Sequence, residues 1–148
     1  MKAMKPLVDR AGVLERNWRC MNDEVPERRA LPQGVAAQHR YLADGIKKLR
    51  RSLGGSEPAA RTLLDALLGD FGQHFALEER LMDRGGYPGI IGHRQEHASF
   101  LEKIRAMRAR SDDSSSELMG VLADTLHSWF SKHEESSDRQ AAEYLKID

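Results

Sequence analysis

The sequence has little of several features that mark common classes of protein. Its 148 residues include one cysteine, Cys20, so no disulfide can form within the chain. Lysine plus arginine and aspartate plus glutamate each number 23, and this balance gives no net field that would favour nucleic acid or an anionic membrane. No apolar run approaches the roughly 20 residues that span a bilayer. We therefore expect a cytoplasmic protein that binds neither nucleic acid nor a membrane.

The first residues, "MKAMKPLVDRAG", also lack the long apolar stretch of a signal peptide, because Asp9 and Arg10 interrupt it. Apolar residues at spacings of three and four predict an amphipathic helix over residues 6–25, which Pro26 ends. Residues 1–30 are thus predicted to be an N-terminal helix and linker. The apolar stripe over residues 7–25 either packs on the rest of the protein or forms a dimer, and we expect a monomer.

The alternation typical of β-strands is absent as well, and apolar residues recur with helical spacing along the rest of the chain. This pattern predicts helices over about residues 35–53, 58–85, 89–110 and 114–145. Ile91 and Val121 are among the apolar positions of the last two. The short loops between the helices predict an all-α fold, an up-down-up-down four-helix bundle over residues 31–148 with an extra N-terminal helix.

The stretch "HFALEERLM" introduces the histidines. His74 and Glu78 are four residues apart, as are His93 and His97, so each pair shares one helix face. Taken alone, such a pair is usually a surface contact. In an up-down bundle, however, both pairs and three further polar residues fall at one end: His39, His133 and Asp138.

Five imidazoles buried together without a metal would leave polar groups unsatisfied, so these seven residues predict a metal site. Imidazole with carboxylate suits iron, zinc, copper or manganese, and no thiolate is available. Seven ligands exceed the needs of one ion but suit two ions bridged by carboxylates. His127, six residues before His133, points elsewhere and is predicted to lie at the surface.

The spacing of His133 and Asp138 does not fit an ideal helix. Residues five apart lie roughly 140° apart around an α-helix. Either a local widening of the π type aligns the two side chains, or Asp138 reaches sideways from the helix end.

The motifs "AAQHRYL", "HFALEERLM", "GHRQEHASF" and "WFSKHEESSD" together resemble hemerythrins, in particular the bacterial single-domain forms. The resemblance covers about residues 31–145. It implies a non-haem di-iron centre with an oxo or hydroxo bridge. In that arrangement His93, His97 and His133 hold one iron, and His39 and His74 hold the other. Glu78 and Asp138 bridge the pair, and O2 binds at the open position of one iron.

The resemblance also implies an apolar O2 pocket formed by Leu42, Phe75, Trp129 and Phe130. Spacing alone would describe the same four residues as core. This sequence departs from the family pattern at Ala36, where an aspartate is common, and at Phe130, where leucine is more usual. It departs again at Glu134, where an apolar residue is usual.

Reversible O2 binding for storage, delivery or sensing is therefore the leading functional prediction, and we expect no enzymatic activity. The alternatives are a di-iron oxidase or peroxidase, and a redox or oxygen signalling module. If Glu134 faces the pocket it would admit water, whereas a solvent-facing Glu134 would be harmless.

Overall fold

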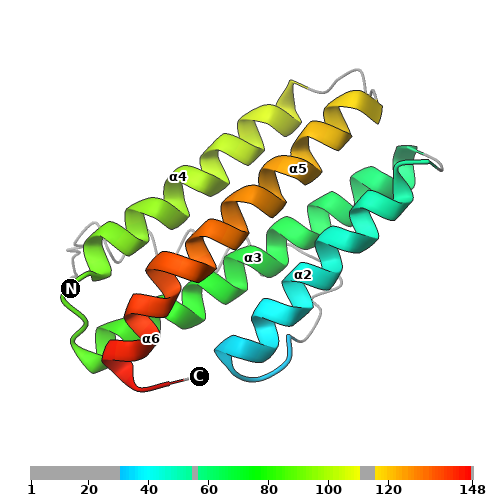
Figure 1. Ribbon diagram of the computed structural model, residues 1–148. Helices are drawn as coiled ribbons and strands as arrows, with labels where there is room; N and C mark the ends of the chain where they lie inside the picture. The colour runs from blue at the N-terminus through cyan, green and yellow to red at the C-terminus, as the bar shows by residue number, and fades with distance from the viewer. Residues whose placement is uncertain (1–30, 55–56, 111–115, 148) are drawn as a thin grey trace, which may run out of the picture. The chain divides into compact units, whose positions relative to one another are not determined.

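A computed structural model describes residues 31–54, 57–110 and 116–147. In these segments the chain is all-α and has no strand, as predicted. Antiparallel helices form the four-helix bundle of Figure 1, in which α3 packs on α2 and α4, and α5 packs on α2 and α4. The elements are α2 (Val35–Ser52), α3 (Glu57–Gly85), α4 (Ile90–Ala109), α5 (Ser116–His133), a π-helical turn η2 (Glu134–Asp138) and α6 (Arg139–Leu145). The helix and dimer contact predicted within residues 1–30 lie outside the described residues.

The helix ends follow the turn chemistry of the sequence. Helix α3 stops at Gly85 because Gly86 takes a left-handed φ of 67°, which glycine adopts without a Cβ penalty. The N–H of Tyr87 then donates to the carbonyl of Met82 at 2.9 Å and closes the helix end. Helix α2 begins after Gly34 with no side-chain cap, and its first turn has no acidic residue. The Gln38 side chain instead donates to the carbonyl of Pro32 at 2.9 Å.

The core is filled by aliphatic side chains and by a cluster of phenylalanines. Phe71, Phe75, Phe100 and Phe130 are buried and contact one another edge to face or tilted, with ring centroids 5.3–6.2 Å apart. This aromatic layer lies directly beside the buried histidines. It joins α3, α4 and α5 at the level where the polar residues meet.

The last helix is not regular. Five residues between α5 and α6 form the π-helical turn η2, and Asp138 at its end is buried. A π-helical turn advances the chain more slowly around the axis than an α-helix does, so residues five apart come to one face. Of the two alternatives for His133 and Asp138, the structure shows the widened helix.

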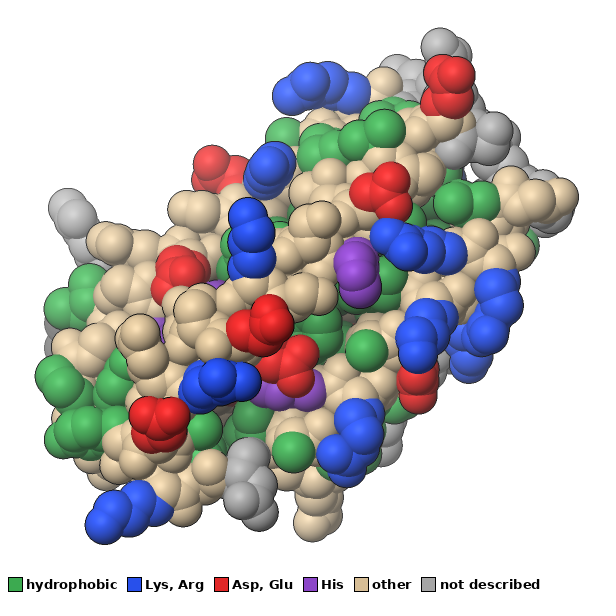
Figure 2. Space-filling model, in the orientation of Figure 1, with side chains coloured by type: hydrophobic (Ala, Val, Ile, Leu, Met, Phe, Trp, Pro, Cys, Tyr) green, Lys and Arg blue, Asp and Glu red, His purple; other side chains and the backbone are tan. Residues whose placement is uncertain are grey.

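The surface carries interspersed charges. On the face shown in Figure 2, acidic and basic side chains alternate without a large patch of one sign. Ion pairs that cross between helices on the surface include Arg108 to Asp65, and Arg50 to Asp124 at 2.7 Å. No helix among the described residues is long and apolar enough to cross a membrane.

Candidate metal centre

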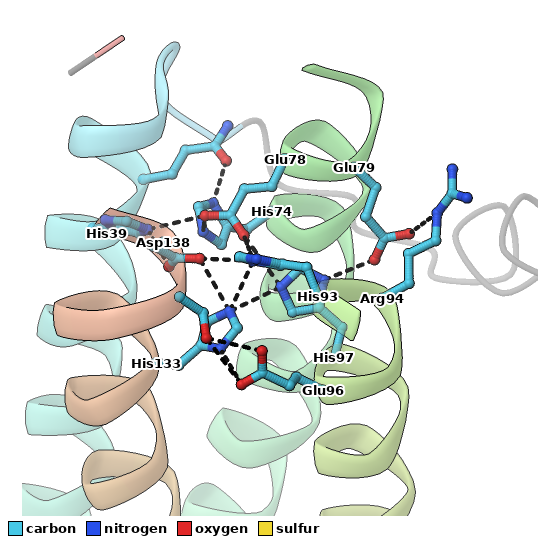
Figure 3. Close-up of polar contacts among 12 residues, drawn as sticks. His39, His74, Glu78, Glu79, His93, Arg94, Glu96, His97, His133 and Asp138 are labelled. Atoms are coloured by element: carbon cyan, nitrogen blue, oxygen red, sulfur yellow. Dashed lines mark hydrogen bonds and ion pairs between the residues drawn. The ribbon is translucent and has the colours of Figure 1, made fainter. Parts of the chain in front are cut away.

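One end of the bundle buries the seven polar residues singled out from the sequence. They come from all four helices and the π turn: His39, His74, Glu78, His93, His97, His133 and Asp138. In Figure 3 these side chains point inward from their helices toward one another. His127, by contrast, is exposed, as predicted. The topology therefore brings together all seven predicted ligands and leaves out the sixth histidine.

Glu78 stands between two groups of histidines. Its Oε2 lies 3.2 Å from Nε2 of His39 and 3.0 Å from Nε2 of His74. Its Oε1 lies 3.6 Å from Nε2 of His93 and 3.2 Å from Nε2 of His97. Each carboxylate oxygen thus faces a different group, which is the arrangement of a carboxylate that bridges two ions.

Asp138 divides its oxygens in the same way. Its Oδ2 lies 3.1 Å from Nε2 of His39, and its Oδ1 lies 2.9 Å from Nε2 of His93 and 3.0 Å from Nε2 of His133. Two sets of candidate ligands follow, and both carboxylates belong to each set. One set contains His93, His97 and His133, and the other contains His39 and His74.

The three-histidine set has the spacing of ligands on a single ion. Nε2 of His133 lies 3.1 Å from Nε2 of His97 and 3.1 Å from Nε2 of His93. Two nitrogens at right angles around an ion about 2.1 Å away would stand about 3 Å apart. Three converging imidazole nitrogens cannot all satisfy one another by hydrogen bonds, but all three can bind a cation.

Buried atoms without a hydrogen-bond partner point to the same conclusion. Among the described residues, those that face the cluster are Nε2 of His74, Oε1 of Glu78 and both carboxylate oxygens of Asp138, and a fifth, Nδ1 of His133, faces outward. Burying such atoms unsatisfied costs free energy, and buried charges are normally paired or bind metals. The residues present therefore fit a metal site with nitrogen and oxygen donors.

The buried carboxylates also shift the pKa values of the histidines around them. Burial opposes the charged form of His39, but the nearby carboxylates of Asp138 and Glu78 outweigh it and raise the pKa of His39 to about 10. The same balance raises the pKa of His93 to about 9, and Glu78 and Glu79 raise the pKa of His97. Burial opposes ionisation of Glu78, yet the surrounding imidazoles hold the pKa of its carboxyl well below the usual value.

Aromatic rings cover the ligands on the side facing the core. Phe75 stacks on the His97 imidazole with ring centroids 3.8 Å apart, and Trp129 stacks on His133 at 4.3 Å. Phe130 meets His39 edge to face at 5.6 Å, and Leu42 is fully buried. The three aromatic residues thus lie against the ligands, while the role of all four residues in holding O2 stays a prediction.

A small cavity of about 20 Å³ lies on another side of the cluster. Glu78 and Asp138 form part of its wall, and none of the four predicted pocket residues lines it. The rest of the wall is apolar: Val35, Leu81, Met82, Ala141, Ala142, Leu145 and Ile147. Helical periodicity does not predict this cavity, because its lining combines residues from the start of α2, the end of α3 and the last helical segment.

Four side chains beside the site were missed from the sequence or left unassigned. Gln38, Glu79, Glu96 and Glu134 each contact the outward Nδ1 of a histidine whose Nε2 faces the site. A signal was present, since each of the four is the immediate sequence neighbour of a predicted ligand. Glu134 neither enters the apolar surroundings nor points freely to solvent. Its Oε2 lies 3.2 Å from Nδ1 of His39, and its side chain is 43% exposed.

Comparisons with known proteins agree with this geometry. The family model described as the hemerythrin HHE cation binding domain matches residues 33–145. A bacteriohemerythrin of Ralstonia nicotianae is 31% identical over 116 residues, which cover 78% of this chain and 85% of the relative. One from Stenotrophomonas maltophilia is 28% identical over 76% of this chain and 73% of its own length. A myohemerythrin of Sipunculus nudus is 28% identical over 51% of this chain and 58% of its own. No solved structure matches the chain. The chain belongs to the hemerythrin family.

Proposed function

We propose that this protein binds O2 reversibly at a di-iron centre. The observation that carries the proposal is the division of each buried carboxylate between two groups of histidines. Glu78 and Asp138 each present one oxygen to the three-histidine set and the other to the two-histidine set. A site for a single ion would not need this division.

In this proposal His93, His97 and His133 hold one iron, and His39 and His74 hold the other. Glu78 and Asp138, which belong to both sets, would be ligands shared by the two ions. The set of five imidazoles and two carboxylates suits iron, and the three-to-two division of histidines leaves the second ion with the smaller number of protein ligands. When bound, the iron pair supplies the electrons and the open coordination position with which O2 combines reversibly.

The chain's own residues protect that chemistry from water. Phe75 and Trp129 cover the faces of His97 and His133, and both rings stack nearly parallel, at 8° and 14°. The stacked rings fix the orientation of the imidazoles and exclude water from the core side of the site. Exclusion of water and protons is what reversible binding requires, because both promote irreversible oxidation.

The cavity beside Glu78 and Asp138 is a second argument for a small apolar ligand. A volume of about 20 Å³ is enough for one water-sized molecule, and the walls apart from Glu78 and Asp138 are apolar. An uncharged diatomic molecule suits such a space better than an organic substrate with polar groups. This observation favours O2 binding over oxidation of a bulky substrate.

The proposal is tested by metal content and oxygen binding in matched histidine variants. We expect about two irons per wild-type chain, and reversible uptake of one O2 per iron pair in anaerobic titration. His74→Ala removes a buried ligand and should lose iron and O2 uptake, whereas His127→Ala removes an exposed imidazole and should retain both. Equal iron content in the two variants would contradict the ligand assignment. Continuous consumption of O2 with a reductant would instead identify a di-iron oxidase or peroxidase.

A further inference from the structure

The outward nitrogens of the histidines are held by side chains that the proposed function does not use. In the described part of the chain, Nδ1 of four of the five buried histidines meets Gln38, Glu79, Glu96 or Glu134. We call these four residues the outer ring. Each comes from a different element, and each stands next to a ligand in the sequence.

The outer ring runs around the bundle in chain order. On α2, Gln38 stands before the ligand His39 and accepts from Nδ1 of His74 on α3, at 2.8 Å. On α3, Glu79 stands after the ligand Glu78 and accepts from Nδ1 of His97 on α4, at 2.7 Å.

The ring then closes through the other two helices. On α4, Glu96 stands before the ligand His97, and its Oε2 lies 3.5 Å from Nδ1 of His133 at the end of α5. In the π turn, Glu134 stands after the ligand His133, and its Oε2 lies 3.2 Å from Nδ1 of His39 on α2. Helices α2, α3 and α4 and the π turn η2 thus each supply both a ligand and the partner of a ligand on another helix. Figure 3 shows two of these contacts, from Glu79 to His97 and from Glu96 to His133.

The members of the ring are themselves held in place to different degrees. Glu79 has a second partner on α4, because its other oxygen lies 3.5 Å from Nε of Arg94. The Ser137 hydroxyl donates to both oxygens of Glu96, at 2.8 and 3.0 Å. At 3.5 Å the Glu96 contact with His133 is an ion-pair distance rather than a hydrogen bond, so Glu96 acts mainly through its charge.

Residue 38 is an amide rather than a carboxylate because its side chain contacts both a donor and an acceptor. Its oxygen accepts from His74, and its nitrogen donates to the Pro32 carbonyl at 2.9 Å. A carboxylate at this position could make the first contact but would repel the carbonyl in the second. The ring therefore contains three carboxylates and one neutral amide.

We propose that the outer ring is a set of positioning residues that keeps Nε2 of the imidazoles they contact aimed at the metal, and that its three negative charges stabilise the ferric state of the centre over the ferrous state. This inference rests on the proposed di-iron function. An imidazole that donates its outer N–H to a carboxylate is a more basic ligand, and such partners commonly change metal affinity by about 10–100-fold. The greater basicity favours the more highly charged ion.

The first experiment measures positioning without iron or O2. Zinc affinity is measured by competition with a chromophoric chelator for wild type, Glu79→Gln, Glu79→Ala and Glu102→Ala. Glutamine can still accept from His97 whereas alanine cannot, and Glu102 is an exposed control on α4. We expect affinity to fall about 10-fold or more for Glu79→Ala and less for Glu79→Gln, with Glu102→Ala unchanged. Equal affinity for Glu79→Ala and Glu102→Ala would overturn the positioning role.

The second experiment measures the charge effect as the reduction potential of iron-loaded protein. Glu79→Gln, Glu96→Gln and Glu134→Gln should each raise the potential, and Glu135→Gln, an exposed neighbour in the same π turn, should not. A tenfold loss of ferric relative to ferrous affinity corresponds to about 59 mV for a one-electron step. Potentials that match the Glu135→Gln control would overturn the charge effect. Two irons and a measurable potential without reversible O2 uptake would contradict the proposed function but leave both tests of the ring readable.

Discussion

Phe75 offers a quantitative test of how core packing supports the metal ligands. Its ring is fully buried and stacks on His97 at 3.8 Å with an interplanar angle of 8°. Phe71 is a matched control, one helical turn earlier on α3 and equally buried. Among the described residues its recorded ring contacts are with Phe75, Phe100 and Phe130 and with no histidine.

Substitution by leucine keeps most of the apolar volume at either position. A shape change of this kind in a packed core costs about 1–3 kcal/mol, so Phe75→Leu and Phe71→Leu should destabilise the metal-free protein by similar amounts. Only Phe75→Leu removes the flat surface that orients His97. We expect this variant alone to lose metal affinity, by about 10–100-fold, which is about 1.4–2.8 kcal/mol.

The assay is urea unfolding with and without bound metal. The difference between the two free energies of unfolding gives the stabilisation that metal contributes to each variant. Phe71→Leu should retain the wild-type difference, and Phe75→Leu should lose about 1.4–2.8 kcal/mol of it. The same metal-linked stabilisation in both variants would show that the stacked ring does not orient the ligand.

Three further outcomes are expected. Deleting Ser136 shortens the π turn by one residue and leaves Asp138 four residues after His133, which is about 40° around an α-helix. Iron content should therefore persist in this variant, and loss of iron would show that the π geometry itself is required. Gly86→Ala should lower the free energy of unfolding by about 1–2 kcal/mol because φ is 67°. Gly92→Ala, exposed in the first turn of α4 with open space for a Cβ, should raise it by up to about 0.5–1 kcal/mol, and thermal melts with both shifts in one direction would contradict this. Ala142→Leu should fill the cavity and slow O2 association in stopped-flow measurements without changing iron content, and an unchanged rate would exclude the cavity as the path.

The sequence predicted the bundle and the seven inward residues because both depend on short-range periodicity. Helical spacing places His74 with Glu78 and His93 with His97 whatever the neighbouring helices do. The glycine pair that predicts the end of a helix is also a short-range signal, and α3 ends there as predicted. Even the irregular spacing of His133 and Asp138 was visible, although only the structure distinguished a π turn from a sideways reach.

Features that depend on contacts between helices were not predictable in the same way. The spacing counted Ile91 and Val121 among the apolar positions, yet their side chains are 67% and 52% exposed. A four-helix bundle buries only a stripe of each helix, and the spacing does not say where that stripe ends. The partners of Glu79 and Glu134 are likewise set by the neighbouring helix, so adjacency to a ligand was the only local signal.

The most direct measurement is the visible absorption spectrum of anaerobically reduced protein before and after O2 is admitted, with iron counted per chain. Reversible binding predicts about two irons and a charge-transfer band that appears with O2 and fades when O2 is removed, over repeated cycles. Two irons that oxidise once, with no band that can be reversed, would contradict reversible O2 binding and leave a redox role for the same centre.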